Sequence, residues 1–217
     1  MIPFSLKYYP PKVLIGIVVL FITLIFGVKS AISLIQGSEI TLFQELIMLV
    51  SSFTLVSLLV YLLNKFIMWG WLLRLLGIPN LRGTYDGKLV SSYHIDDDPK
   101  KPHVTKYLVV TISQNLNGFY VRSKFYDRKG NREFSSQSES LSHAVKPNPD
   151  GSYTIEYLYH NLPNTLHKAH TRDVLNTHQG FCVLRFDPVN RSLEGKYFND
   201  TETRPSFGSI SLTPKQD

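Results

Sequence analysis

The chain has a single cysteine among 217 residues, and two long stretches near its beginning contain almost no charge. One cysteine excludes an internal disulfide framework. Cys182 lies in an apolar stretch, which predicts ordinary core packing in a reducing cytoplasm. The sequence also lacks a phosphate-binding P-loop, a Gly-x-Ser-x-Gly elbow and a paired acid–base motif. We therefore expect no enzymatic activity.

Metal ligands are also poorly represented. The chain places His160, His167, His170 and His178 close together, and the spacing of 167 and 170 suits a ligand pair. No nearby cysteine or carboxylate completes a tetrahedral set. The acidic run at 96–98 lacks the glycine and the later glutamate of a calcium loop. The sequence predicts neither a metal site nor a cofactor.

The two nearly uncharged stretches, interrupted by Lys29 in the first, are long enough to cross a bilayer. They run over about 13–35 and 46–63, and the second can extend to 73. Roughly 20 apolar residues span a hydrocarbon core about 30 Å thick. A cleaved signal peptide fits poorly, because the first stretch is too long and no small-residue cleavage site follows it. Two buried helices of a soluble bundle remain an alternative.

Basic residues lie on the outer sides of these two stretches, and the loop between them carries two glutamates. The flanking lysines and arginines are Lys7, Lys12, Lys65, Arg74 and Arg82, and the loop residues are Glu39 and Glu45. Since cytoplasmic flanks of membrane spans are enriched in Lys and Arg, this pattern predicts a multi-pass protein with both termini in the cytoplasm.

Net charge gives little indication of a nucleic-acid partner. Residues 1–81 and 82–217 each carry a net charge of about +3, so the positive charge is partly that of the anchor. A duplex-binding surface needs a denser basic stripe. We therefore expect no DNA or RNA partner.

After residue 80 the pattern changes to short alternating segments separated by turn signals. Strands are predicted near Arg82–Tyr93, Thr105–Asn115, Phe119–Tyr126, Arg132–Val145, Ser152–His160, Gly180–Phe186, Ser192–Asn199 and Ser206–Leu212. Meander order with short turns favours a closed barrel over a sandwich, because closure leaves no open edge. The predicted fold is two N-terminal transmembrane α-helices (1–79) followed by an all-β domain (80–217), an eight-stranded, up-and-down, lipocalin-like β-barrel.

The predicted inward faces of this barrel are rich in hydroxyl groups. They contain Tyr85, Tyr153, Tyr157, Tyr159 and Tyr197, with Ser136 and Ser138 on a strand that reads FSSQSES. Buried hydroxyls need partners. A polar ligand with flat rings would supply them, and hydroxyls gathered at the barrel mouth are the alternative.

Three segments carry a family resemblance: IPNLRGTYDGKL, YLYHNLP and LEGKYFNDTETRPSFGSISL. With the two apolar stretches before them, they resemble the membrane-anchored β-barrel effectors of bacterial CBASS anti-phage systems. The resemblance implies a barrel that binds a cyclic oligonucleotide made by a partner CD-NTase. It further implies a homo-oligomer on activation, action on membrane lipid and a location in the bacterial inner membrane.

A cyclic dinucleotide offers two phosphates and two bases, so its site needs cations and aromatic faces. The candidate ligand-binding residues are Arg204, Tyr197, Tyr157, Tyr159, Asn161, Arg122 and Arg185. The two last alternate with apolar residues and could equally face solvent.

Two other functions use the same parts. A membrane-tethered, lipocalin-like carrier of an apolar ligand predicts an interior dominated by Leu, Val and Phe. A structural anchor that recruits another protein predicts a filled core.

Overall fold

The computed structural model describes residues 77–95, 98–115, 118–164, 177–200 and 206–216, together with scattered helical positions between 16 and 61. At two of these positions, Thr23 and Thr54, the hydroxyl donates to the carbonyl oxygen four residues earlier, at 2.9 and 2.8 Å. In the described part of the chain, no helix is both long and apolar enough to cross a bilayer. The predicted spans fall largely outside the described residues and stay predictions.

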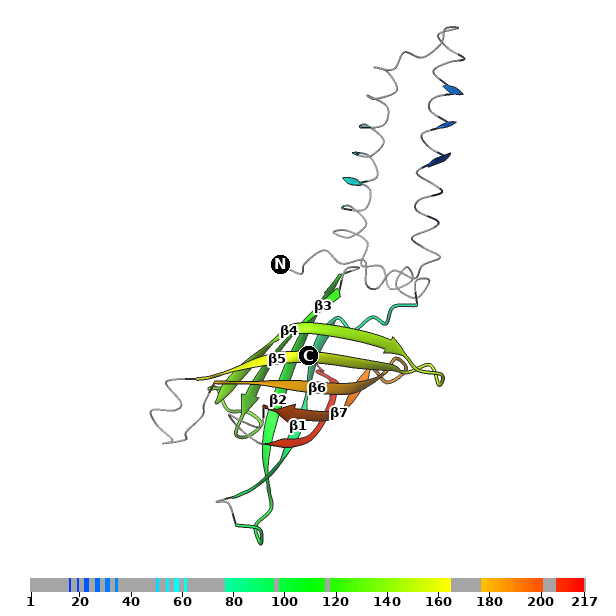
Figure 1. The fold of residues 1–217 in the computed structure, drawn as a ribbon. Coiled ribbons are helices and arrows are strands. Elements are labelled where there is room, and N and C mark those ends of the chain that lie inside the picture. Colours follow the sequence, from blue (N-terminus) through cyan, green and yellow to red (C-terminus); the bar gives the residue numbers. More distant parts are fainter. Residues whose placement is uncertain are drawn as a thin grey trace. The chain divides into compact units, whose positions relative to one another are not determined.

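Eight antiparallel strands form a closed barrel in sequence order (Figure 1). They are β1 (Gly83–His94), β2 (His103–Asn115), β3 (Gly118–Tyr126), β4 (Ser136–Pro147), β5 (Tyr153–Pro163), β6 (His178–Asp187), β7 (Ser192–Asn199) and β8 (Phe207–Pro214). Pairing of β1 with β8 closes the barrel. The predicted eight-stranded up-and-down barrel is confirmed.

One predicted strand boundary is wrong by four residues. The fourth strand begins at Ser136 and not at Arg132. The reason is a local turn: the Ser135 amide donates to the Phe125 carbonyl oxygen at 2.7 Å, and the Ser135 hydroxyl donates to the same oxygen at 3.1 Å. This contact ends β3 and holds the preceding residues out of the sheet.

The connections divide the barrel into two different ends. The longer connections, β1–β2, β3–β4, β5–β6 and β7–β8, leave from one end, which we call the loop end. The shorter connections, β2–β3, β4–β5 and β6–β7, leave from the opposite end, which we call the plug end. The β4–β5 and β6–β7 turns of the plug end lie at the right of Figure 1.

The plug end is filled with apolar side chains. Leu81 and Leu193 are 0% exposed, and Tyr85 and Phe186 are 1% exposed. The Tyr85 hydroxyl donates to the Leu81 carbonyl oxygen at 2.9 Å. The buried Gln114 amide accepts from the Leu81 amide at 2.6 Å and donates to the Pro79 carbonyl oxygen at 2.8 Å. These hydrogen bonds hold residues 79–81, which lead into β1, in place over the plug end of the core.

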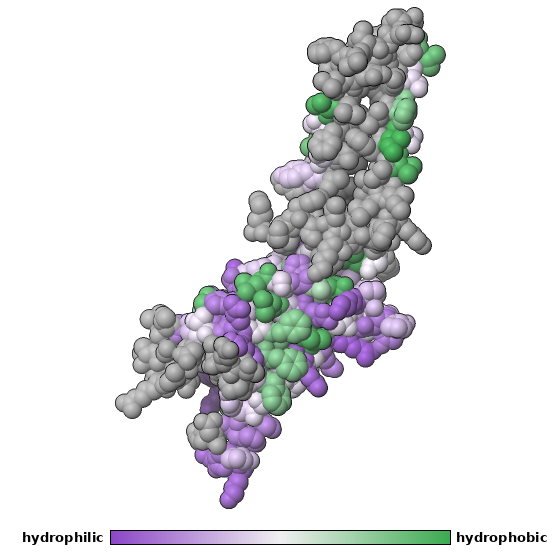
Figure 2. Space-filling model, in the orientation of Figure 1, coloured by the Kyte–Doolittle hydropathy of each residue, from purple (hydrophilic) through white to green (hydrophobic). Residues whose placement is uncertain are grey.

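The outer face of the barrel carries an apolar row. Phe181, Phe198 and Phe207 pair directly across β6, β7 and β8, and their exposed fractions are 40%, 45% and 61%. Leu158 on β5 continues the row. Figure 2 shows apolar side chains gathered on this view of the barrel, with hydrophilic residues around them. We call these four residues the phenylalanine row.

Candidate functional site

The interior of the loop end is polar. Four inward side chains lie in one cross-strand row over β3, β4, β5 and β6, because Ser123 pairs with Ser138, Ser138 with Asn161, and Asn161 with His178. Their exposed fractions are 3%, 4%, 4% and 7%, in the order Ser123, Ser138, Asn161 and His178. We call these four residues the polar row. Directly opposed residues on one sheet face lie close enough to act on one group.

Three members of the polar row, Ser123, Ser138 and Asn161, make no side-chain hydrogen bond to another residue within the ranges that the structure describes. An unsatisfied buried polar group costs about 1–3 kcal/mol, and native proteins contain few of them. Three such groups in one row indicate a place where a bound molecule supplies the missing partners.

Aromatic rings surround the polar row. Tyr157, Tyr159 and Tyr197 are 5%, 7% and 5% exposed, and the rings of Tyr157 and Tyr159 lie 6.3 Å apart. Together with Ser123 and Ser138 they line a cavity of about 20 Å³. Such a volume holds about one water molecule, whereas sites for drug-sized ligands measure about 300–1,000 Å³. A ligand can enter only if side chains move.

A hydrogen-bonded chain connects the interior to the ends of two strands. The Tyr159 hydroxyl donates to Asn199 Oδ1 at 2.5 Å, and Asn199 Nδ2 donates to Ser206 Oγ at 2.5 Å. The Tyr159 ring lies over Gly180, where an added Cβ would be 2.3 Å from the Tyr159 hydroxyl oxygen. Gly180 therefore leaves the space that this ring occupies. Asn199 ends β7 and Ser206 precedes β8, next to the phenylalanine row.

Apart from the imidazole of His178, the described buried side chains of the loop end carry no charge. Burial raises the pKa of the Cys182 thiol to about 12. Burial and then the neighbouring Cys182 raise the pKa of Tyr157 well above its usual range. No lysine, arginine, aspartate or glutamate is among the buried side chains of the described ranges. Groups that bind inside this half must be neutral, because an unpaired buried charge is strongly unfavourable.

The structure brings together four of the candidate residues and places two others elsewhere. Tyr157, Tyr159, Asn161 and Tyr197 all point into the loop end. Arg122 lies on the outer face of β3, where its Nε donates to Glu139 at 3.2 Å and its guanidinium lies 5.9 Å from the Tyr120 ring centroid. Its ligand-binding role stays a prediction, which the ion pair with Glu139 does not favour.

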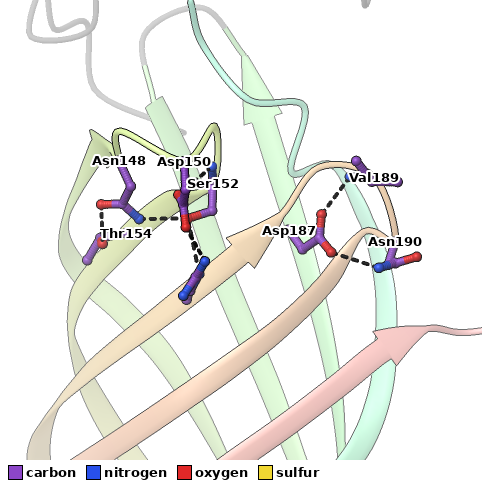
Figure 3. Close-up of polar contacts among 8 residues, drawn as sticks. Asn148, Asp150, Ser152, Thr154, Asp187, Val189 and Asn190 are labelled. Atoms are coloured by element: carbon purple, nitrogen blue, oxygen red, sulfur yellow. Dashed lines mark hydrogen bonds and ion pairs between the residues drawn. The ribbon is translucent and has the colours of Figure 1, made fainter.

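Arg185 lies at the plug end, where it contacts the β4–β5 turn. Its Nε donates to Ser152 Oγ at 3.1 Å and its terminal nitrogen pairs with Asp150. Figure 3 shows Asp150 and Ser152 within the β4–β5 turn, beside the Asp187-centred β6–β7 turn. The Asp150 carboxylate also accepts from the Ser152 hydroxyl at 2.6 Å. Arg185 thus joins β6 to the β4–β5 turn, at the opposite end from the polar row.

The β4–β5 turn should make stability depend on pH. The Ser152 hydroxyl and amide, with a smaller contribution from Arg185, lower the pKa of Asp150. Because the folded-state pKa is the lower one, this stabilisation is present above about pH 4 and disappears as the pH falls through the folded-state value. Asp150→Asn should therefore unfold at a lower temperature than wild type at pH 7, with a smaller difference at a pH below about 4. Thermal unfolding followed by near-UV circular dichroism measures this difference.

An equal difference between wild type and Asp150→Asn at both pH values would contradict the assignment, because it would mean that the carboxylate charge is not the stabilising element.

Arg204, the first candidate for a phosphate contact, lies outside the described residues, as do His167 and His170. The four loop-end connections contain as many acidic residues as lysines and arginines, so their net charge is close to zero. In the described ranges, no three His, Cys, Asp or Glu side chains lie close enough together to hold a metal ion.

Sequence reasoning missed two members of the polar row. Ser123 follows Phe119 and Val121 at every second position of β3, so alternation alone could have placed it inside. His178 stands in the sequence among other histidines, a pattern that suggests only metal binding, and its place beside Asn161 depends on the pairing of β5 with β6. No signal within a single strand predicts that register.

Comparison with known proteins identifies relatives of this barrel. Residues 76–214 match a family model described as Cap15, cyclic dinucleotide receptor domain. A curated relative, CD-NTase-associated protein 15 of Yersinia aleksiciae, is 32% identical over 79 residues, which are 36% of this chain and 35% of that protein. The chain thus aligns with about a third of the length of this relative. No solved structure matches.

Proposed function

This chain belongs to the family of Cap15 cyclic dinucleotide receptor domains, and we propose that its barrel binds a cyclic dinucleotide at the loop end. The observation that carries the proposal is the set of three unpartnered buried side chains, Ser123, Ser138 and Asn161, in a neutral interior lined by tyrosines. The family description and the chemistry of the site thus support the same class of ligand. The described residues that carry the site come from β3, β4, β5 and β7.

The two chemical parts of such a ligand suit different parts of the loop end. Bases have flat faces and neutral polar edges, for which tyrosine rings and amide or hydroxyl groups are suitable partners. Phosphates need cations, which the connections of this end supply in Arg128, Arg132 and Arg204. Acidic residues in the same connections equal the lysines and arginines in number. Recognition of the phosphates would therefore depend on specific contacts rather than on long-range electrostatic attraction.

The wider role follows from the family. We propose that the chain is a CBASS effector whose signal is made by a partner CD-NTase, and that ligand binding promotes self-association. The predicted spans would then act on the bacterial inner membrane, with both termini in the cytoplasm. A ligand shifts such an equilibrium only by binding the associated state more tightly than the monomer.

The phenylalanine row supports self-association. Three aromatic side chains exposed by 40–61% form a contiguous apolar strip on one sheet face. Exposed apolar patches on soluble domains commonly mark interaction sites. Phe198 and Phe207 of the row are the sequence neighbours of Asn199 and Ser206. Inside the barrel, the Tyr159 hydroxyl donates to Asn199, which in turn donates to Ser206. These hydrogen bonds connect the ligand site to the phenylalanine row on the surface. We propose that a second copy of this chain binds to the row.

Phe198→Ser should weaken ligand-dependent association about tenfold or more, because it removes an apolar side chain from the centre of the row. Analytical ultracentrifugation of the full chain in detergent, with and without cyclic dinucleotide, measures the effect. Val189→Ser is a matched control, since Val189 is 86% exposed and lies in the β6–β7 turn at the plug end. Equal association of Phe198→Ser and wild type would remove the row from the proposal.

Calorimetric titration of the full chain with a panel of cyclic dinucleotides tests the ligand class. At least one member should bind at a ratio of one per barrel, while the corresponding linear dinucleotides should bind much more weakly because they are not preorganised. An apolar carrier would instead take up a fatty acid and ignore every cyclic dinucleotide, and that result would overturn the proposal.

A further inference from the structure

The unpaired amide and hydroxyl groups of the polar row indicate the shape and polarity of the chemical group that should bind there. Ser138 lies between Ser123 and Asn161 in direct cross-strand register, so one amide and two hydroxyls converge from β3, β4 and β5. An amide offers a donor and an acceptor side by side, and each hydroxyl can act as either. The complementary group is a flat polar edge with neighbouring donor and acceptor positions, such as a nucleobase presents.

A phosphate does not suit this place. Apart from the imidazole of His178, the described buried side chains around the row carry no charge. Burying an anion without a cation beside it is unfavourable. A phosphodiester group would therefore stay at the rim, while the neutral part of the same ligand could enter.

We propose that one nucleobase of the bound cyclic dinucleotide enters the loop-end interior, with its edge hydrogen-bonded to Asn161 and Ser138 and its phosphates remaining outside. The inference rests on the proposed function and assigns the contacts within that site. It makes Asn161 a residue that determines which base is accepted.

Entry of a base requires a larger opening than the cavity of about 20 Å³. Tyr159 is the side chain best placed to provide it, because it lines the cavity and lies two residues from Asn161 on the same strand. Its hydroxyl is held by Asn199 at 2.5 Å. When Tyr159 turns away, that hydrogen bond breaks and its ring face becomes available to stack on the incoming base.

Asn161→Leu provides a test that separates a binding role from a structural one. The substitution replaces an unpartnered buried amide by an apolar group of similar size, so the ligand-free protein should unfold at the same temperature as wild type or a higher one. Affinity for the tightest-binding cyclic dinucleotide should fall about 10- to 100-fold, because a bidentate contact to a base edge is lost. Both are measured on the full chain in detergent, by thermal unfolding and by calorimetric titration.

Three further measurements sharpen the test. Gln179→Leu makes the same change of an amide on the outer face of β6 and should bind like wild type. Ser138→Ala should weaken binding in the same direction as Asn161→Leu. Asn161→Asp, which lacks the amide donor, should change the order of affinities across cyclic dinucleotides that differ in their bases.

The outcomes distinguish the inference from the proposed function. If wild type binds a cyclic dinucleotide and both Asn161→Leu and Ser138→Ala bind it equally well, the base lies elsewhere and the inference is wrong, while the proposed function stands. If Asn161→Leu loses stability together with binding, Asn161 has a structural role and the inference is also wrong. If wild type binds no member of the panel, the proposed function fails and the inference with it.

Discussion

Replacing Gly87 by alanine should prevent the barrel from closing. A Cβ at this position would lie 2.0 Å from the Ser211 carbonyl oxygen and 2.9 Å from its carbonyl carbon. Both atoms belong to the backbone of β8, which pairs with β1 to close the barrel. Overpacking a core typically costs about 1–3 kcal/mol, and a clash with backbone at the closing pair should lie at or above the upper end of that range.

The expected result for Gly87→Ala is an unfolded or aggregated barrel, seen as loss of the near-UV circular dichroism of its buried tyrosines. Lys88→Ala is the matched control, because Lys88 is the next residue on β1, is exposed and pairs with Ser211, the residue of β8 whose carbonyl the added Cβ at Gly87 would meet. It should unfold within a few degrees of wild type. A Gly87→Ala variant as stable as wild type would mean that the β1–β8 pairing differs from the one described.

Removing residues 1–75 should abolish membrane damage completely and leave ligand binding intact. The remaining chain contains the whole stretch that matches the family, residues 76–214, and the strands that close the barrel. A domain of about 140 residues can bury a sufficient core of its own. The predicted spans are removed, and in our account they are the part that acts on lipid. Calorimetric titration of the soluble fragment and dye entry into cells that express it with an active cyclase measure the two effects.

The full chain expressed with an inactive cyclase is the control for this experiment, and its cells should exclude the dye. Dye entry in cells that express only the fragment would place the damaging activity in the barrel. A fragment that folds but no longer binds the ligand that the full chain binds would place part of the site before residue 76.

The strand order could be predicted because each strand is marked locally. Turn residues separate the segments, and alternation places Tyr157 and Tyr159 on the same inward face. The boundary of β4 could not be predicted, because it depends on a contact between Ser135 and Phe125 from the neighbouring strand. Local patterns thus specify strands, while turn contacts decide where they begin.

The candidate site was only partly predictable for the same reason. Tyr197 and Asn161 were expected to bind ligand from their residue types, and the structure places both inside the loop end. The polar row itself depends on the register between four strands, which a sequence does not display. The inward hydroxyls predicted from the sequence include Tyr85, whose ring is buried at the plug end among the apolar side chains of Leu81, Leu193 and Phe186.

For Arg122 and Arg185 the sequence leaves two orientations open, and the structure places both side chains on the outer face. Both are suitable phosphate ligands by type, but each alternates with buried neighbours and faces outward. Their carboxylate partners, Glu139 and Asp150, lie on other segments, so the ion pairs become visible only in the folded barrel.

Hydrogen–deuterium exchange of the full chain, with and without a saturating cyclic dinucleotide, tests most directly whether the ligand binds at the loop end. The account predicts slower exchange of the peptides that cover Ser136–Ser140 and Tyr157–Asn161, and unchanged exchange at the turns around Asp150 and Asp187. Slower exchange confined to those two plug-end turns, with no change along the polar row, would contradict it.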